Sequence, residues 1–272
     1  MSEHSGTPLH ARGSPHRSIA PPAMSDEVEN MVEVKALTMG WGDTILQRDA
    51  SFAVQRGDIF AILGGSGCGK STMLRYLIGL EHPMSGEIRI AGIGEPKLEL
   101  GRPPFGVMFQ SGALFSSMTV GENVGLSLSS WTNLPPDAVA AIVDAKLKLV
   151  GLGPAALKMP SELSGGMKKR AAIARALALD PDLLFLDEPS AGLDPVSAVE
   201  LDDLILTLNE TLGLTVVIVT HELASIFKIV KHCVMLDKAT QSIIARGDPR
   251  ELRDRSENPR VREFFNRERS EE

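Results

Sequence analysis

The chain contains the stretch Gly64-Gly65-Ser66-Gly67-Cys68-Gly69-Lys70-Ser71, which fits the phosphate-binding pattern GxxxxGK[ST]. An apolar run over residues 59–63 precedes it and predicts a buried strand, and residues 71–80 follow it with a helical pattern. A strand, a glycine loop and a helix in this order are the context that the motif requires. The glycines allow backbone N–H groups to point at phosphate oxygens, and the helix N-terminus adds the positive end of its dipole. We therefore expect this stretch, together with Thr72, to bind a nucleoside triphosphate.

Three side chains of the loop have separate expected roles. Lys70 is expected to reach the β and γ phosphates, and the Ser71 hydroxyl is expected to ligate Mg²⁺. Cys68 has two interpretations: a thiol whose pKa is lowered by the helix N-terminus, or a small side chain at a variable position of the motif. The second interpretation is favoured.

Composition is that of an ordinary globular protein and restricts the partners. The 272 residues allow one large domain or two small ones. A formal net charge of −7 argues against nucleic acid as the main partner, because binding phosphates requires a basic face. No apolar run of about 18 residues is present, so we expect any membrane role to come through a partner chain. The two cysteines, Cys68 and Cys233, fit a reducing compartment and are not expected to pair.

The first residues differ in composition from the rest. His, Ser, Pro and Gly dominate residues 1–23, and no apolar segment of about 7–15 residues marks a secretory signal. Such a composition cannot form a packed core, so residues 1–30 are predicted to be a disordered N-terminal extension. Met24 and Met31 are alternative starting residues.

The remaining chain alternates short apolar runs with helical patterns, which indicates a parallel sheet flanked by helices. Strands are predicted at residues 32–37, 50–54, 59–63, 87–91, 183–186 and 215–219, and helices at 71–80, 119–128, 136–150, from 164 onward and 196–212. Parallel sheets bind their ligands at the carboxyl ends of the strands. The residues that directly follow these strands are therefore the candidates for a functional site.

Three side chains beyond the glycine loop follow such strands, and a fourth, Gln110, follows the apolar residues 107–109. Asp187 comes after residues 183–186, where a carboxylate is expected to orient Mg²⁺ through water. Glu188 should point elsewhere, because side chains alternate along a strand, and is then free to polarise an attacking water. His221 is expected near the γ phosphate, and Gln110 is expected to reach both Mg²⁺ and that water. In isolation these residues would be ordinary turn or structural residues; the glycine loop in the same sheet favours the functional interpretation.

A second anion site is predicted 94 residues after the first, counted from Lys70 to Ser164. Ser164 is a good N-cap, and Gly165 and Gly166 expose backbone donors at the start of a helix. One chain cannot easily fold this segment over its own glycine loop. A second copy in a head-to-tail, two-fold arrangement could present it to the γ phosphate.

Across residues 32–250 these segments together resemble the nucleotide-binding subunit of ABC transporters. The resemblance assigns Walker A to residues 64–71, the Q-loop to Gln110, the LSGGQ signature to 163–167, Walker B to 183–187, the D-loop to 190–194 and the switch histidine to His221. It implies that Glu188 is the catalytic base and that Asp194 lies in a loop that contacts the opposite subunit. It also implies that Trp41 stacks on adenine; a partly buried loop aromatic is the alternative.

The fold implied by this resemblance is α/β, a P-loop NTPase of the ABC ATPase type. A RecA-like parallel-sheet core would be joined by an antiparallel β subdomain and a helical subdomain. The ATPase domain would span residues 31–250, with the helical subdomain at about 111–166, followed by a tail at 251–272. A solvated helix is favoured for the Arg- and Glu-rich tail. The alternative is docking on a sister subunit through Val261, Phe264 and Phe265.

Three further segments point to a subfamily. Met167 stands where the signature usually has Gln, and residues 109–115, 160–167 and 258–265 resemble the ATPase of Mla-type (MCE-associated) phospholipid transport systems. The resemblance implies ATP and Mg²⁺, and a homodimer bound to an integral-membrane permease at the cytoplasmic face of the inner membrane. It also implies an MCE-domain lipid-binding partner and phospholipid as the transported substrate.

The permease is expected to contact residues 111–124, where Leu114, Phe115 and Met118 form an apolar cluster; internal packing is the alternative. An importer subunit for amino acids or metals shares every catalytic motif and is the second candidate function. A non-transport ABC protein that acts on DNA or ribosomes is disfavoured by the acidic charge. The 94 residues from Lys70 to Ser164 also lack the long coiled-coil insertion typical of such proteins.

Overall fold

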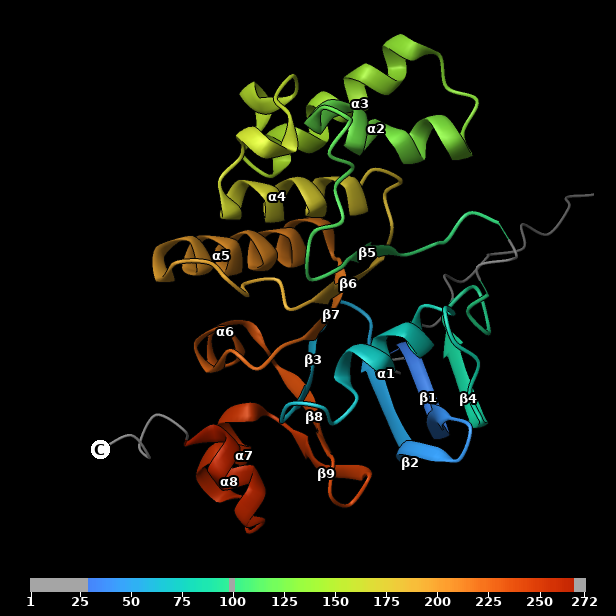
Figure 1. Ribbon diagram of the computed structural model, residues 1–272, viewed down its shortest axis with the longest axis vertical. Helices are drawn as coiled ribbons and strands as arrows, with labels where there is room; N and C mark the ends of the chain where they lie inside the picture. Colours follow the sequence, from blue (N-terminus) through green and yellow to red (C-terminus); the bar gives the residue numbers. More distant parts are fainter. Residues whose placement is uncertain (1–28, 98–100, 267–272) are drawn as a thin grey trace, which may run out of the picture.

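A six-stranded sheet runs through the centre of the molecule (Figure 1). The computed structural model describes residues 29–97 and 101–266. The strands lie in the order β5-β6-β7-β3-β8-β9. Their bounds are β3 Ile59–Gly64, β5 Gly106–Met108, β6 Leu183–Asp187, β7 Thr215–Val219, β8 His232–Asp237 and β9 Ser242–Gly247. All neighbours are parallel except β8 and β9, so β5, β6, β7, β3 and β8 end at the same edge of the sheet.

The central strands are covered by protein on both faces. Every residue of β3, β6 and β7 is buried. Alternate side chains face two different cores: Phe185 belongs to the core beneath the second sheet, whereas Leu184 belongs to the core beneath the helices. Because both faces are apolar, these strands appear in the sequence as continuous apolar runs rather than as alternating ones.

A second, antiparallel sheet in the order β2-β1-β4 confirms the expected β subdomain. Its strands are β1 Asn30–Trp41, β2 Thr44–Gln55 and β4 Ser85–Ile90. The long strands contain irregular positions: Ala36 and Asp49 have φ of 47° and 48°, close to register shifts in the pairing. These bulges interrupt the alternation and explain why β1 and β2 are longer than predicted.

Helix α1 (Lys70–Leu77) follows the glycine loop and shares a core with the antiparallel sheet. The hydroxyl of Tyr76 donates to the carbonyl of Gly40 at 2.9 Å and accepts from its N–H at 3.2 Å. The C-terminal turn of the loop helix is therefore attached to the end of β1.

A helical layer lies on the other side of the six-stranded sheet (Figure 1). It consists of α2 Val120–Trp131, α3 Pro136–Leu149, α4 Gly165–Ala176 and α5 Pro195–Leu212, with 3-10 turns at Gly153–Ala155 and Pro160–Glu162. Helices α4 and α5 are nearest the sheet, whereas α2 and α3 pack on α4 farther from it. Thr119 and Glu122 form a capping box at the start of α2. None of the helices in the described ranges has the length and apolar composition that spanning a bilayer requires.

The loop between β5 and α2 is fixed by one buried amide. Asn123 Oδ1 accepts from the N–H of Phe115 at 2.7 Å, and Nδ2 donates to the carbonyls of Phe115, Met118 and Thr119. The loop that follows Gln110 therefore has a defined shape rather than being an open connection.

The C-terminal segment corrects one expectation. Helices α6 (Leu223–Ile229), α7 (Pro249–Arg255) and α8 (Pro259–Phe265) pack together, and Val261, Phe264 and Phe265 are buried in the chain's own core. The prediction of a solvated helix is wrong for this stretch, and these three side chains are committed within the chain rather than offered to a sister subunit. Residues 1–28 and 267–272, on which part of the predicted extension and tail falls, lie outside the described residues.

Candidate active site

The glycine loop joins β3 to α1 with three residues at positive φ: Gly64 at 145°, Gly67 at 73° and Gly69 at 99°. Glycine is required at Gly64, because a Cβ there would lie 2.4 Å from the carbonyl oxygen of Leu236. Lys70 Nζ donates to the carbonyls of Gly64 and Gly65, at 2.9 and 3.1 Å. The ammonium therefore lies over the loop, where phosphate oxygens would meet it.

A cavity of about 520 Å³ opens in front of this loop. Its described lining residues are Gly64, Ser66, Gly67, Gly69, Lys70, Ser71, Thr72, Gln110, Glu188 and His221. Gln110, Glu188 and His221 come from three different segments of the chain. They meet because β5, β6 and β7 end at the same sheet edge as β3. The structure thus brings together the loop and the three polar side chains that the sequence placed after strands.

Asp187 lies next to Ser71, which lines the cavity. The Ser71 hydroxyl donates to Asp187 Oδ1 at 3.1 Å. Burial raises the pKa of the Asp187 carboxyl above its ordinary value, and the Ser71 hydrogen bond opposes that shift. Two oxygen ligands at the loop fit Mg²⁺, which prefers oxygen and usually keeps several waters. No group of three His, Cys, Asp or Glu side chains converges in the described part of the chain, so this ion would also need phosphate and water oxygens.

Glu188 has an unusual backbone and a carboxylate with one free oxygen. Its φ is 46°, a region that costs a non-glycine residue about 1–3 kcal/mol and that recurs at active sites. The N–H donates to the carbonyl of Val219 at 2.8 Å. Oε1 lies 2.7 Å from His221 Nδ1, whereas Oε2 is buried without a hydrogen-bond partner. An unsatisfied acceptor beside the phosphate loop fits the position of a water to be polarised.

Lys169, a residue absent from the sequence predictions, lies beneath both Gln110 and Glu188. It is only 7% exposed, and its Nζ donates to the carbonyl of Gln110 at 2.6 Å and to that of Glu188 at 3.1 Å. Burial lowers the pKa of Lys169, and the Asp187 and Glu188 carboxylates oppose that shift. In the sequence it is a lysine four residues after the start of the signature helix, and this pattern predicts only an ordinary solvated charge.

The signature segment lies away from this cavity. Ser164 Oγ accepts from the N–H of Met167 at 3.3 Å and caps α4, as predicted. A Cβ on Gly165 would lie 3.3 Å from Leu193, so the signature packs beside the D-loop, where Asp194 caps α5. Ser164, Gly165, Gly166 and Asp194 are not among the described residues that line the cavity. The structure therefore does not bring the two predicted anion sites together within one chain.

Cys68 and Trp41 each had two interpretations from the sequence, which the burial of their side chains now bears on. Cys68 is 2% exposed, and burial raises the pKa of its thiol, so the reactive-thiol interpretation is wrong; the burial fits the other interpretation, a small side chain in the motif. Trp41 ends β1 and is 51% exposed, outside the described lining of the cavity. Its stacking on adenine stays a prediction.

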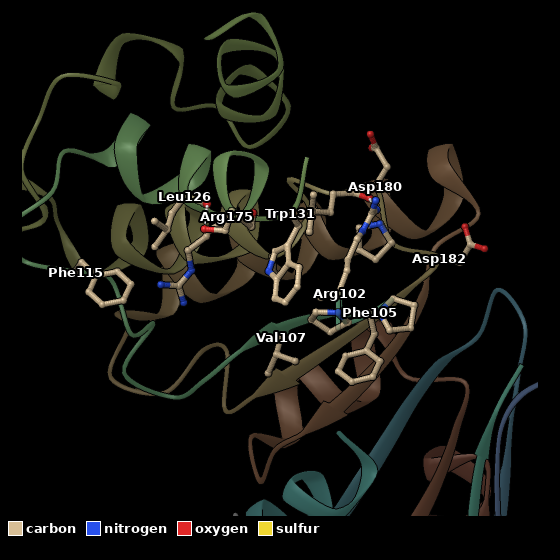
Figure 2. Close-up of a pocket in the computed structure, with 17 residues that line it drawn as sticks. Arg102, Phe105, Val107, Phe115, Leu126, Trp131, Arg175, Asp180 and Asp182 are labelled. Carbon is tan, nitrogen blue, oxygen red and sulfur yellow. Dashed lines mark hydrogen bonds between the residues drawn. The ribbon is translucent and has the colours of Figure 1, made fainter. Parts of the chain in front are cut away.

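A groove of about 660 Å³ lies between the helical layer and the β5 edge of the sheet. Figure 2 shows Phe115, Leu126 and Trp131 around it, above Val107 and Phe105. The predicted apolar cluster divides here: Phe115 is 51% exposed and lines the groove, Leu114 packs on the core, and Met118 lines a different hollow. Only Phe115 of the three thus faces the groove.

The fold and this geometry define a P-loop nucleotide-hydrolysing protein, and comparison with known proteins gives the family. Residues 47–191 match the family model described as ABC transporter. The intermembrane phospholipid transport system ATP-binding proteins MlaF of Haemophilus influenzae and Escherichia coli K12 are both 41% identical, over 87% and 89% of this chain and 90% and 91% of theirs. The probable ribonucleotide transport ATP-binding protein mkl of Mycobacterium leprae is 40% identical over 86% of this chain and 68% of its own.

Solved structures agree with this assignment. The cbiO1 protein from Clostridium perfringens, part of the ABC transporter complex cbiONQ, has a TM-score of 0.74 at 30% identity, covering 83% of this chain and 91% of its own. The ATP-binding cassette MJ0796, a dimer in a post-hydrolysis state bound to ADP and Pi, has a TM-score of 0.71 at 30% identity, covering 80% and 98%. The chain belongs to the ABC transporter family and is an ATPase of that family.

Proposed function

We propose that this chain powers a membrane transporter that moves phospholipid between bacterial membranes. Two copies would act together with an integral-membrane permease and an MCE-domain lipid-binding protein, at the cytoplasmic face of the inner membrane. The two MlaF relatives are ATP-binding proteins of intermembrane phospholipid transport systems and align with nearly the whole chain, which supports the phospholipid substrate. The separation of the signature segment from the glycine-loop cavity supports the pair of copies, because each site is then incomplete without its partner.

Each residue of the cavity has a role in hydrolysis that its contacts support. The glycine loop and Lys70 bind the phosphates, and Ser71, Asp187 and Gln110 would hold Mg²⁺, which neutralises charge on the phosphoryl oxygens. Glu188 accepts a proton from the attacking water through Oε2, while His221 holds Oε1. The partner's signature helix would add backbone donors to the γ phosphate.

The groove in Figure 2 is the surface that we assign to the permease. Phe115 and Trp131 are 51% and 49% exposed there, and two large apolar side chains exposed in one groove fit contact with a partner helix. The groove is connected to the catalytic machinery through the chain, since Phe115 follows Gln110 by five residues in the same loop. A permease helix in this groove can therefore respond to movement of the Gln110 loop.

The test is capture of the complex from native membranes with Glu188→Gln, which should hold the closed, ATP-bound pair. Glu210→Gln, an exposed residue on α5, is the matched control. We expect a multi-spanning permease, an MCE-domain protein and bound phospholipid, identified by mass spectrometry, and fewer of them with the control. A permease with a solute-binding protein, or with bound nucleotide as cargo, would contradict the phospholipid substrate and leave the ATPase mechanism. Ribosomal or DNA-bound partners would contradict transport.

A further inference from the structure

Lys169 is a buried cation that no part of the proposed mechanism uses. It lies on α4, five residues after the capping Ser164, and its ammonium contacts two backbone carbonyls rather than a solvated carboxylate. Buried lysines are rare unless their charge is satisfied. Both acceptors belong to residues that line the nucleotide cavity, Gln110 and Glu188, so the ammonium connects the backbones of two functional side chains.

The connection joins segments that are otherwise separate in the chain. Gln110 follows β5, Glu188 follows β6, and Lys169 lies between them on the helix that begins with the signature. Arg175, farther along the same helix, donates to the carbonyl of Gly112 at 3.0 Å. Two basic side chains of α4 therefore hold the backbone of the Gln110 loop, and one of them also holds Glu188.

At Glu188 the contact bears directly on where the carboxylate points. The residue has a positive φ, and its peptide groups are fixed on both sides: the N–H by Val219, and the carbonyl by Lys169 and by the N–H of Ala191 at 3.2 Å. A strained backbone conformation of this kind persists only when contacts with the surrounding structure hold it in place. Loss of the lysine contact would leave the carbonyl with the longer bond to Ala191 and let the backbone relax.

We propose that Lys169 is a positioning residue for the hydrolytic step, which sets the spacing of the Gln110 and Glu188 side chains by holding their carbonyls on one ammonium group. This inference rests on the roles proposed above for those two residues. Lys169 is not among the described residues that line the cavity, and its ammonium donates to Gln110 and Glu188 rather than to the glycine loop. The proposal therefore predicts a change in the rate of hydrolysis with little change in ATP affinity.

The test compares four variants of the full chain, purified with the membrane partners it captures. Lys169→Met removes the ammonium, Lys169→Arg keeps a cation that can donate to both carbonyls, and Lys169→Gln keeps one donor group. Lys168→Met, at the adjacent exposed lysine, is the matched control for the loss of one charge from α4. The measurements are kcat and KM for ATP, the Kd of a fluorescent ATP analogue, and the unfolding temperature.

We expect Lys169→Met to lower kcat by about 100-fold, the effect of a misplacement near 1 Å, with Kd for the analogue within about threefold of the parent. Lys169→Arg should restore most of the rate, and Lys168→Met should behave as the parent. If Lys169→Met does not fold, Lys169→Gln is measured in its place. Its loss of kcat should be smaller than about 100-fold, because the amide keeps one donor group.

Two results would overturn the proposal: unchanged kcat in the Met and Gln variants, or equal losses of ATP affinity and rate that Arg does not restore. Glu188→Gln serves as the reference in the same assay. If it hydrolyses ATP at the parental rate, the proposed role of Glu188 fails. If it is inactive while Lys169→Met is fully active, only the inference about Lys169 fails.

Discussion

His221 Nδ1 lies 2.7 Å from Glu188 Oε1, and the other oxygen of that carboxylate is buried without a partner. A carboxylate can only accept, so Nδ1 carries the proton in this contact and the imidazole fixes the rotation of the carboxyl group. Glu188 lines the nucleotide cavity, so the second oxygen is left as the acceptor for a water bound there. The two side chains come from neighbouring strands β6 and β7, whose parallel pairing places their ends side by side.

Replacing His221 with Ala should lower kcat for ATP hydrolysis by about 100-fold, the lower range for an acid–base contribution, with ATP affinity retained. The reason is that the Glu188 carboxylate loses its orienting donor, while the glycine loop keeps its contacts. Steady-state kinetics and nucleotide titration measure the two effects. Because the pair acts as a unit, adding His221→Ala to Glu188→Gln should cost little more than Glu188→Gln alone. Independent, multiplying losses would contradict this coupling.

Gly64→Ala should destabilise the chain by about 1–3 kcal/mol even without nucleotide, because φ of 145° is strained for any residue with a Cβ. The added Cβ would also meet the Leu236 carbonyl at 2.4 Å, a backbone atom that cannot move aside cheaply. Gly65→Ala is the control for stability, since a Cβ there meets nothing within 4 Å. Urea unfolding of both variants gives the free energies. Equal stability of the two would show that the loop is not constrained at Gly64.

Cys233 should be almost unreactive in the folded chain, because burial raises the pKa of its thiol to about 12. At pH 8 the thiolate fraction then falls roughly 1000-fold below that of the unfolded chain. The folded state holds this proton more tightly, so the thiol's contribution to stability is complete below about pH 9 and declines as the pH rises toward 12. Alkylation by iodoacetamide in a Cys68→Ala background measures the rate. Modification as fast in native protein as in urea would contradict the burial.

The sequence predicted the parts of the site that depend on local chain order. One apolar run ends in the glycine loop, and another ends in Asp187 and Glu188. Each pattern predicts a strand and also predicts that the residues after it lie at the carboxyl edge of the sheet. Lys169 could not be found this way, because its partners are backbone carbonyls 59 and 19 residues away in sequence. A side chain that recognises backbone leaves no matching residue type in the sequence to signal the contact.

The lengths of β1 and β2 were underestimated for a related reason. Bulges near Ala36 and Asp49 shift the pairing, so apolar positions change phase within each strand. Trp41, at the end of β1, was identified only by resemblance, and its exposed indole is compatible with stacking without requiring it.

The tail was misjudged because a short amphipathic helix does not show in its sequence which surface it covers. Residues 261, 264 and 265 have the spacing of one helix face, and in the structure that face packs on the chain itself: Phe265 lies 5.7 Å from Phe227, ring centre to ring centre.

Phe265→Ala should therefore cost the isolated chain about 3–5 kcal/mol of stability, as expected for a buried aromatic. Glu263→Ala, exposed on the same helix, should change stability by less than about 0.5 kcal/mol. Urea unfolding at several protein concentrations separates this from an intersubunit role. A Phe265→Ala effect that grows with concentration would assign the side chain to the dimer, whereas a constant loss assigns it to the core of one chain.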